Sequence, residues 1–293
     1  MKREDNLSER KLYTISFLII FMLVIYISLI KYKEVISQVM SSFIIEKVTT
    51  NNKDSLMDNR KKIRYKHLSI YYATSDEQLL PYTEKSLNRA MELNDSLFGI
   101  RYTKPYDFII FRDRTEIETF SGLEHAIGIH SPAYNVLGVL PENKEEIIAN
   151  IGPQVWNYQS NIIHEYTHYV FIQKIAEVGL DNTDFPLWFL EGIAEYLALD
   201  NLNGRPLEVS NVIPLNELIT SEQWNKYRTE TEYDIYLQSE KTIYTLVDKF
   251  GPEIINKIIH ETGKKKNFQE GFESATNTSI MKLDEHIRNN KGL

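Results

Sequence analysis

The hydrophobic pattern of the chain begins with one long apolar run. Residues 12–30 contain no charged side chain, and Lys11, Lys31 and Lys33 flank them. A helix needs about 20 apolar residues to cross a bilayer, so the run predicts a transmembrane helix. The run is longer than the apolar region of most cleaved signal peptides, and no A-x-A-like cleavage site follows it. The pattern therefore favours an uncleaved signal anchor in the cell membrane over a signal peptide.

Charged and polar residues on either side of this anchor set the expected organisation. Basic residues favour the cytoplasmic side, and more of them precede the anchor than follow it. We therefore expect residues 1–11 to form a cytoplasmic tail and the rest of the chain to lie outside the cytoplasm. Residues 31–61 become polar and turn-rich, which predicts a stalk. A folded domain is then expected at residues 62–293.

Shorter periodic segments follow in this domain. Strand patterns occur at 67–73 and 107–111 and on both sides of Ser131-Pro132 within 126–140. Helical patterns occur at 79–97 and 115–120, and again from about Val155 to the end, with breaks at 179–186, 201–214 and 251–252. The order predicts a small mixed β-sheet followed by a mainly helical half, in one α+β domain.

Composition and charge exclude several classes of protein. Apolar residues make up 42% and charged residues 25% of the chain, which is typical of a folded globular protein. The chain has no cysteine, which excludes a disulfide scaffold, a thiolate metal site and a thiol nucleophile. The net charge is −8, and the part after residue 33, with 27 basic and 38 acidic residues, carries −11. So acidic a domain is not expected to bind nucleic acid.

One segment carries a pattern with specific chemistry. His164, Glu165 and His168 form an H-E-x-x-H sequence inside a helical run. Residues four apart lie about 40° apart on a helix, so both imidazoles would lie on one face, one turn apart. That arrangement can bind one metal ion, with the glutamate beside the ion as a base. The alternative is a helix with two surface histidines.

A second helical segment makes that alternative less attractive. Glu191 and Glu195 lie one turn apart within 185–199, next to an apolar stripe where a purely structural helix rarely carries carboxylates. A carboxylate from this helix would complete a His₂Glu zinc site with an open position for water. The other carboxylate would accept the free ring N–H of a ligand histidine.

The two segments together resemble the gluzincin metallopeptidases. The chain has H-E-x-x-H, then 22 residues, then E-G-x-A-E-Y, and Trp188 completes a W-x-x-E-G-x-A pattern. This is most similar to the compact bacterial peptidase MA-like domains, and more distantly to thermolysin and aminopeptidase N. The resemblance implies one Zn²⁺ per chain, held by His164, His168 and Glu191, with Glu195 behind the ligands.

The resemblance also bears on two flanking elements. Gluzincins place an edge strand that pairs with the substrate upstream of the zinc helix, which corresponds here to Asn135, Val136, Leu137 and Gly138. An ordinary internal strand is the alternative. MA-like domains also have a Y-x-x-S stretch similar to that at Tyr236, whose hydroxyl would stabilise an oxyanion unless it is a packing residue. The remaining five histidines are expected to be structural or exposed.

These observations lead to a first hypothesis and two alternatives. The first is a membrane-anchored zinc peptidase that acts on peptides or proteins, with Glu165 as general base. No G-x-M-E-N segment like that of aminopeptidases is evident, which favours an endopeptidase. The second is an inactive zinc-binding, peptide-binding or sensor domain on a peptidase scaffold. The third is a structural membrane protein with an accidental motif.

Overall fold

The computed structural model describes residue 53 and residues 56–199, 209 and 211–289. The chain divides into two compact units, Met1–Leu56 and Met57–Leu293, and the description below concerns the second. The predicted tail, the predicted anchor at 12–30 and most of the predicted stalk lie outside the described residues. Among the helices that the structure describes, none combines the length and the apolar character that a membrane crossing requires.

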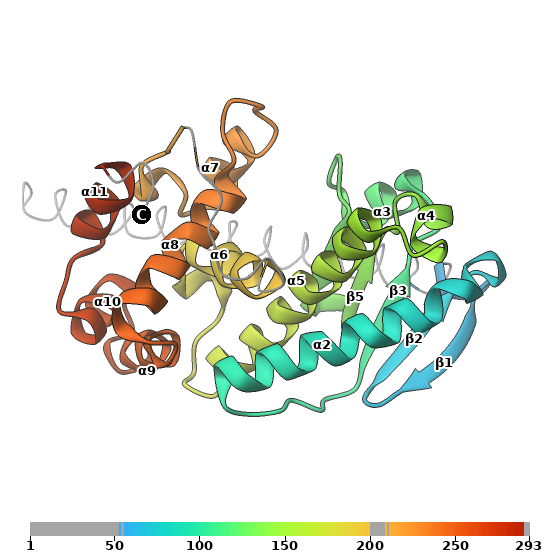
Figure 1. Ribbon diagram of the computed structural model, residues 1–293. Coiled ribbons are helices and arrows are strands. Elements are labelled where there is room, and N and C mark those ends of the chain that lie inside the picture. The colour runs from blue at the N-terminus through green and yellow to red at the C-terminus, as the bar shows by residue number, and fades with distance from the viewer. Residues whose placement is uncertain (1–52, 54–55, 200–208, 210, 290–293) are drawn as a thin grey trace, which may run out of the picture. The chain divides into compact units, whose positions relative to one another are not determined.

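The second unit contains a five-stranded mixed sheet in the order β1-β2-β3-β5-β4 (Figure 1). The antiparallel pairs are β1 with β2 and β4 with β5, whereas β3 lies parallel to both β2 and β5. The strands span Lys61–Tyr65 (β1), Leu68–Tyr72 (β2), Tyr106–Ile110 (β3), Gly128–Ser131 (β4) and Val136–Val139 (β5). The two edges of the sheet are therefore β1 and β4.

This order corrects the prediction about the edge strand. Val136, Leu137 and Gly138 lie in β5, which pairs with β3 on one side and β4 on the other, and Asn135 lies in the preceding turn. All four residues of β5 are buried, as expected for a continuous apolar strand with neighbours on both sides. The edge of the sheet is instead the half-buried strand β4, the first strand of the same hairpin.

Two long helices pack against each other beside the sheet. They are α2 (Leu80–Phe98) and α5 (Gly152–Ala176), and α5 also contacts β4 and β5 (Figure 1). Each helix has a proline in its first turn, where the missing N–H costs nothing. The shorter helices of this half are η1 (Thr74–Leu79), α3 (Arg114–Ser121), η2 (Pro132–Tyr134) and α4 (Lys144–Ile148).

The second half is helical, as predicted, and its centre is a close helix pair. In α6 (Leu187–Ala198), Gly192 lies so near α8 (Ile235–Phe250) that a Cβ there would be 2.5 Å from the carbonyl oxygen of Ser239. The glycine thus allows the two backbones to approach. The other elements are η3 (Asn182–Asp184), η5 (Leu215–Glu217), α7 (Ser221–Tyr227), α9 (Glu253–Lys265), α10 (Phe268–Thr276) and α11 (Ile280–Asn289).

The α+β class and the order of a small sheet before helices are confirmed. Strand β1 and helix α4 are among the short elements that were not predicted. The segment just before β1 contacts the folded unit through a side-chain ion pair. The guanidinium of Arg60 is buried and lies 2.5 Å from the carboxylate of Glu116.

Candidate metal centre

Helix α5 brings the two histidines of the H-E-x-x-H sequence together. His164 and His168 lie one turn apart, and their Nε2 atoms are 3.0 Å from each other. The ring planes meet at 77°, so the two rings approach edge to face. Both side chains are only slightly exposed. Two ring nitrogens that close need a shared proton or cation between them, since neutral lone pairs alone would repel.

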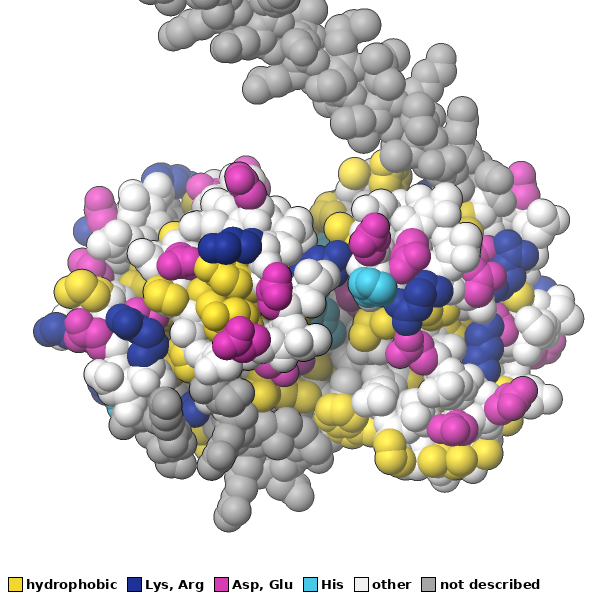
Figure 2. All heavy atoms as spheres, turned by 90° about the horizontal axis from the view of Figure 1, so that it is seen from above, with side chains coloured by type: hydrophobic (Ala, Val, Ile, Leu, Met, Phe, Trp, Pro, Cys, Tyr) yellow, Lys and Arg dark blue, Asp and Glu magenta, His cyan; other side chains and the backbone are white. Residues whose placement is uncertain are grey.

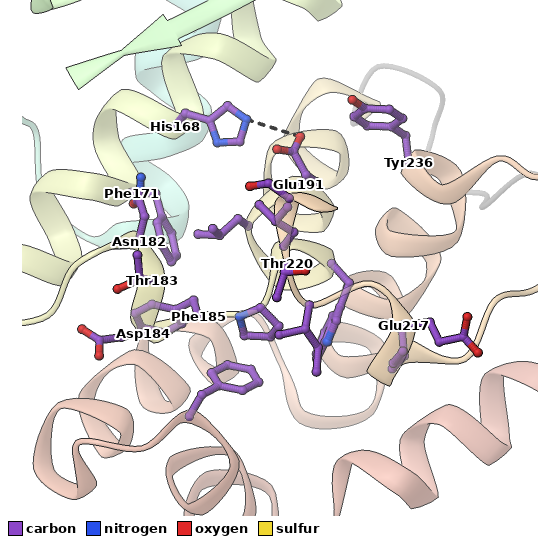
Figure 3. Close-up of a pocket in the computed structure, with 18 of the residues that line it drawn as sticks. His168, Phe171, Asn182, Thr183, Asp184, Phe185, Glu191, Glu217, Thr220 and Tyr236 are labelled. Carbon is purple, nitrogen blue, oxygen red and sulfur yellow. Dashed lines mark ion pairs between the residues drawn. The ribbon is translucent and has the colours of Figure 1, made fainter. Parts of the chain in front are cut away.

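Helix α6 supplies a third donor at the same point. An Oε2 atom of Glu191 lies 3.2 Å from Nε2 of His164 and 3.5 Å from Nε2 of His168, and Figure 3 marks the second contact. Zinc–nitrogen distances of about 2.0–2.1 Å would set tetrahedral donors about 3.3 Å apart. The observed separations are close to that value. The donor set of two imidazoles and one carboxylate therefore fits Zn²⁺ in both chemistry and spacing.

The second carboxylate of α6 orients one of these histidines. Nδ1 of His164 donates a hydrogen bond to Oε1 of Glu195 at 3.0 Å. This contact places the ring proton on Nδ1 and leaves the lone pair of Nε2 directed toward His168 and Glu191. Because Glu191 and Glu195 lie one turn apart, they contact the two different ring nitrogens of His164.

The charges around the donors favour a cation at this position. Burial alone would raise the pKa of Glu191, but the neighbouring His168 and His164 hold the pKa of that carboxyl well below its usual range. Burial alone would lower the pKa of His164, but Glu195 and Glu191 raise it well above its ordinary value. The pocket therefore holds positive charge strongly, whether a proton or a metal ion supplies it.

Glu165 lies in the same site but outside the donor set. Its side chain is 8% exposed and extends from α5 to a place beside Gly128 of strand β4. Burial raises the pKa of its carboxyl, although the two adjacent histidines oppose this shift. A carboxylate with a raised pKa that does not ligate an ion is placed to exchange a proton.

Tyr236 lies on the other side of the donors, in the first turn of α8. Its ring centroid is 6.3 Å from that of His164, and in Figure 3 it lies beyond Glu191 as seen from His168. The ring also packs edge-on against Trp224 at 5.0 Å. Burial raises the pKa of its hydroxyl, so the group stays protonated and can donate a hydrogen bond.

These side chains line one cleft of ≈ 1220 Å³. One face of the compact unit is visibly hollowed in Figure 2, between two parts of its surface. Strand β4 forms one wall with Gly128, Ile129 and His130, and the floor comes from α5 and α6. Segments of the helical half complete the lining and add apolar side chains, among them Phe185, Phe268, Ile280 and Met281.

His130 is a residue of this site that the sequence did not reveal. Its ring stacks on His168, with centroids 6.2 Å apart and planes at 14°, and its Nε2 lies 3.0 Å from the hydroxyl of Tyr106. Burial, together with His168, lowers its pKa to about 3, so the ring is neutral. The signal in the sequence was the two-residue spacing of Gly128 and His130, which puts both residues on one face of a strand.

The other histidines behave as predicted. His67, in the turn before β2, stacks on Tyr169 of α5 with ring centroids 5.7 Å apart, and so is structural. His125, His260 and His286 are exposed. None of these four belongs to the donor cluster found among the described residues.

Comparison with known proteins gives one informative match. No protein-family model matches the chain. Over 236 residues the chain is 37% identical to a protein of Bacillus subtilis strain 168 described as uncharacterized protein YhcO. The match covers 80% of this chain and 73% of that protein. The chain belongs to the YhcO family. The description of that relative states no activity, so the chemistry of this YhcO-family chain must be argued from its own residues.

A further buried carboxylate of this YhcO-family chain lies near Glu195, behind the candidate metal donors. Glu240, on α8, is 4% exposed, and its Oε2 has no hydrogen-bond partner among the described residues. Burial, and then the negative charge of Glu195, raise its pKa to about 7, while Lys241 opposes the shift. The folded protein therefore favours the protonated form of this side chain.

We expect Glu240→Gln to stabilise the YhcO-family protein at pH 8 and to change its stability little at pH 5. The folded-state pKa of about 7 exceeds the ordinary value of 4.5. The contribution of this side chain to stability is thus fully present below about pH 4.5 and is lost as the pH rises from there through 7, by up to about 3 kcal/mol. The Tm of both proteins at pH 5 and pH 8 measures this.

The exposed Glu285 on α11 provides the control for this comparison. Glu285→Gln should change the Tm by a similar small amount at both pH values. If Glu240→Gln also gave equal changes at pH 5 and pH 8, the raised pKa of Glu240 would be contradicted.

Proposed function

We propose that this chain is a zinc-dependent peptidase of the gluzincin type, anchored in the cell membrane by residues 12–30. The observation that carries the proposal is the convergence of His164, His168 and Glu191 at 3.0–3.5 Å, with Glu165 beside them and outside the donor set. A site that only stored a metal would not need a fourth, buried acid next to the donors. The resemblance of the sequence to peptidase MA-like domains supports the same reaction.

Each residue around the candidate zinc site would have a separate role in peptide hydrolysis. Bound zinc would polarise the substrate carbonyl and make water acidic enough to react near neutral pH. Glu165 would take a proton from the attacking water and pass it to the leaving amine. The hydroxyl of Tyr236 would donate a hydrogen bond to the oxyanion that develops during attack. Glu195 would keep His164 in the tautomer that ligates through Nε2.

The cleft supports an extended polypeptide as the substrate. Among the described strands β4 pairs with β5 alone, and its residues line the same cleft as Glu165 and His168. A peptide in extended form can add to such an edge through its backbone, without a demand for particular side chains. The open cleft is also consistent with cleavage inside a chain, so we propose an endopeptidase. The predicted anchor would present this cleft outside the cytoplasm.

The full chain, purified in a mild detergent, tests the proposal. We expect about one zinc per chain, hydrolysis of an unstructured protein such as casein, loss of that hydrolysis after treatment with a chelator, and recovery on addition of zinc. Stoichiometric zinc without hydrolysis would favour the inactive binding or sensor domain. A folded chain that takes up no zinc at neutral pH would contradict both.

A further inference from the structure

The backbone conformation of Gly128, on the edge strand β4, does not require a glycine. Its φ lies outside the left-handed range, and it pairs with Val139 in a regular antiparallel ladder. Any L-residue can adopt this conformation, and a β-branched residue would suit a strand better. The space around the residue therefore has to explain the glycine.

The three atoms nearest to the position of the missing Cβ are all in the side chain of Glu165. A Cβ on residue 128 would overlap Oε1 of Glu165 and lie only 2.9 Å from both Cδ and Cγ of the same residue. Carbon atoms pack at about 3.5–4.0 Å, so three consecutive atoms of Glu165 would have to move. A rotation of the carboxylate alone would leave Cγ in contact, so the χ1 angle of Glu165 would have to change.

We infer that Gly128 is a positioning residue for Glu165, because the side chain it lacks leaves the space in which this carboxylate lies. The inference rests on the proposed function, in which Glu165 is the general base. The side chain of Glu165 is 8% exposed and lines the cleft beside the donors, so a change of its χ1 angle would move the carboxylate from that place. The same face of β4 presents His130 to His168, so the strand contacts both parts of the H-E-x-x-H sequence.

The metal donors should not share in this displacement. The three atoms nearest to the added Cβ all belong to Glu165, and none belongs to His164, His168 or Glu191. A substitution at residue 128 therefore separates the position of the base from the integrity of the metal site. If Gly128 had only a structural role, its substitution would not lower kcat while the zinc content stayed unchanged.

The first experiment compares Gly128→Ala with the parent in the full chain. We expect kcat on casein-derived peptides to fall about 10²-fold, because a displacement of about 1 Å of a reacting group has that effect. KM and zinc content should stay at the parent values. The control is Gly152→Ala, since a Cβ there meets nothing within 4 Å and the residue begins the same helix α5. Parent-like kcat in Gly128→Ala would overturn the inference.

A second experiment tests the contact between residue 128 and Glu165 without a measurement of catalysis. We expect Gly128→Ala to lower the Tm of the parent but not that of a Glu165→Ala variant, in which the overlapping atoms are gone. An equal fall of Tm in both backgrounds would overturn the inference. If the parent hydrolyses no peptide, the proposed function fails, but this cycle of four proteins still decides whether Gly128 makes the space for Glu165.

Discussion

Replacement of Glu165 by Gln should lower kcat by about 10²- to 10⁴-fold while the zinc content stays at one per chain. The amide has the shape of the carboxylate, so it fits the space beside Gly128, but it cannot accept the proton of the attacking water. Zinc should remain, because His164, His168 and Glu191 do not depend on Glu165 for their contacts. The fall corresponds to about 3–5 kcal/mol of transition-state stabilisation.

This expectation is measured by steady-state kinetics and metal analysis on the same preparations of the full chain. Glu285→Gln, an exposed substitution on α11, makes the same chemical change far from the cleft lining and should retain parent kcat. Parent-like turnover in Glu165→Gln would remove Glu165 from the mechanism. Loss of zinc in this variant would instead mean that the carboxylate helps to hold the ion.

The two carboxylates of α6 should have unequal effects on metal binding. Glu191 contacts both Nε2 atoms, so Glu191→Ala removes one of three donors, and we expect zinc to be lost on dialysis. Glu195 contacts only the Nδ1 of His164, so Glu195→Ala should weaken zinc affinity about 10- to 100-fold and leave the donor set complete. Both residues lie on one helix, one turn apart, so each variant serves as the control for the other.

A competition titration against a chromophoric zinc chelator separates these outcomes. We expect a measurable Kd for the parent and for Glu195→Ala, and no competition by Glu191→Ala. Equal loss of affinity in the two variants would contradict the assignment of Glu191 as ligand and Glu195 as its support. Circular dichroism of both variants would show whether α6 remains folded.

Local spacing in the sequence was sufficient to predict the centre of the site. His164 and His168 are one turn apart on any helix, and the same is true of Glu191 and Glu195, so each pair follows from the 3.6-residue period. The structure then brings the two helices together at the distances that a shared ion requires. That meeting of two segments was inferred from chemistry and from the resemblance to gluzincins, since no local pattern encodes it.

The wall of the cleft could not be predicted in the same way. Which strand of the β4–β5 hairpin lies at the edge depends on the parallel pairing of β5 with β3, a contact between distant segments. The place of His130 against His168 depends on that choice and on the position of α5. Strand β1 was missed because Lys61–Tyr65 is mostly exposed and polar, so its sequence resembles a linker more than a strand.

The origin of the metal donors in two separate helices has a consequence for the unfolded chain. An ion shared by His168 and Glu191 closes a loop of 22 intervening residues. In a protein without cysteine, such a link lowers the conformational entropy of the unfolded chain as a disulfide would. For a loop of this size, the folded state is stabilised by about 3 kcal/mol. Unlike a disulfide, the link is reversible, so the durability of the folded protein would follow the free zinc concentration.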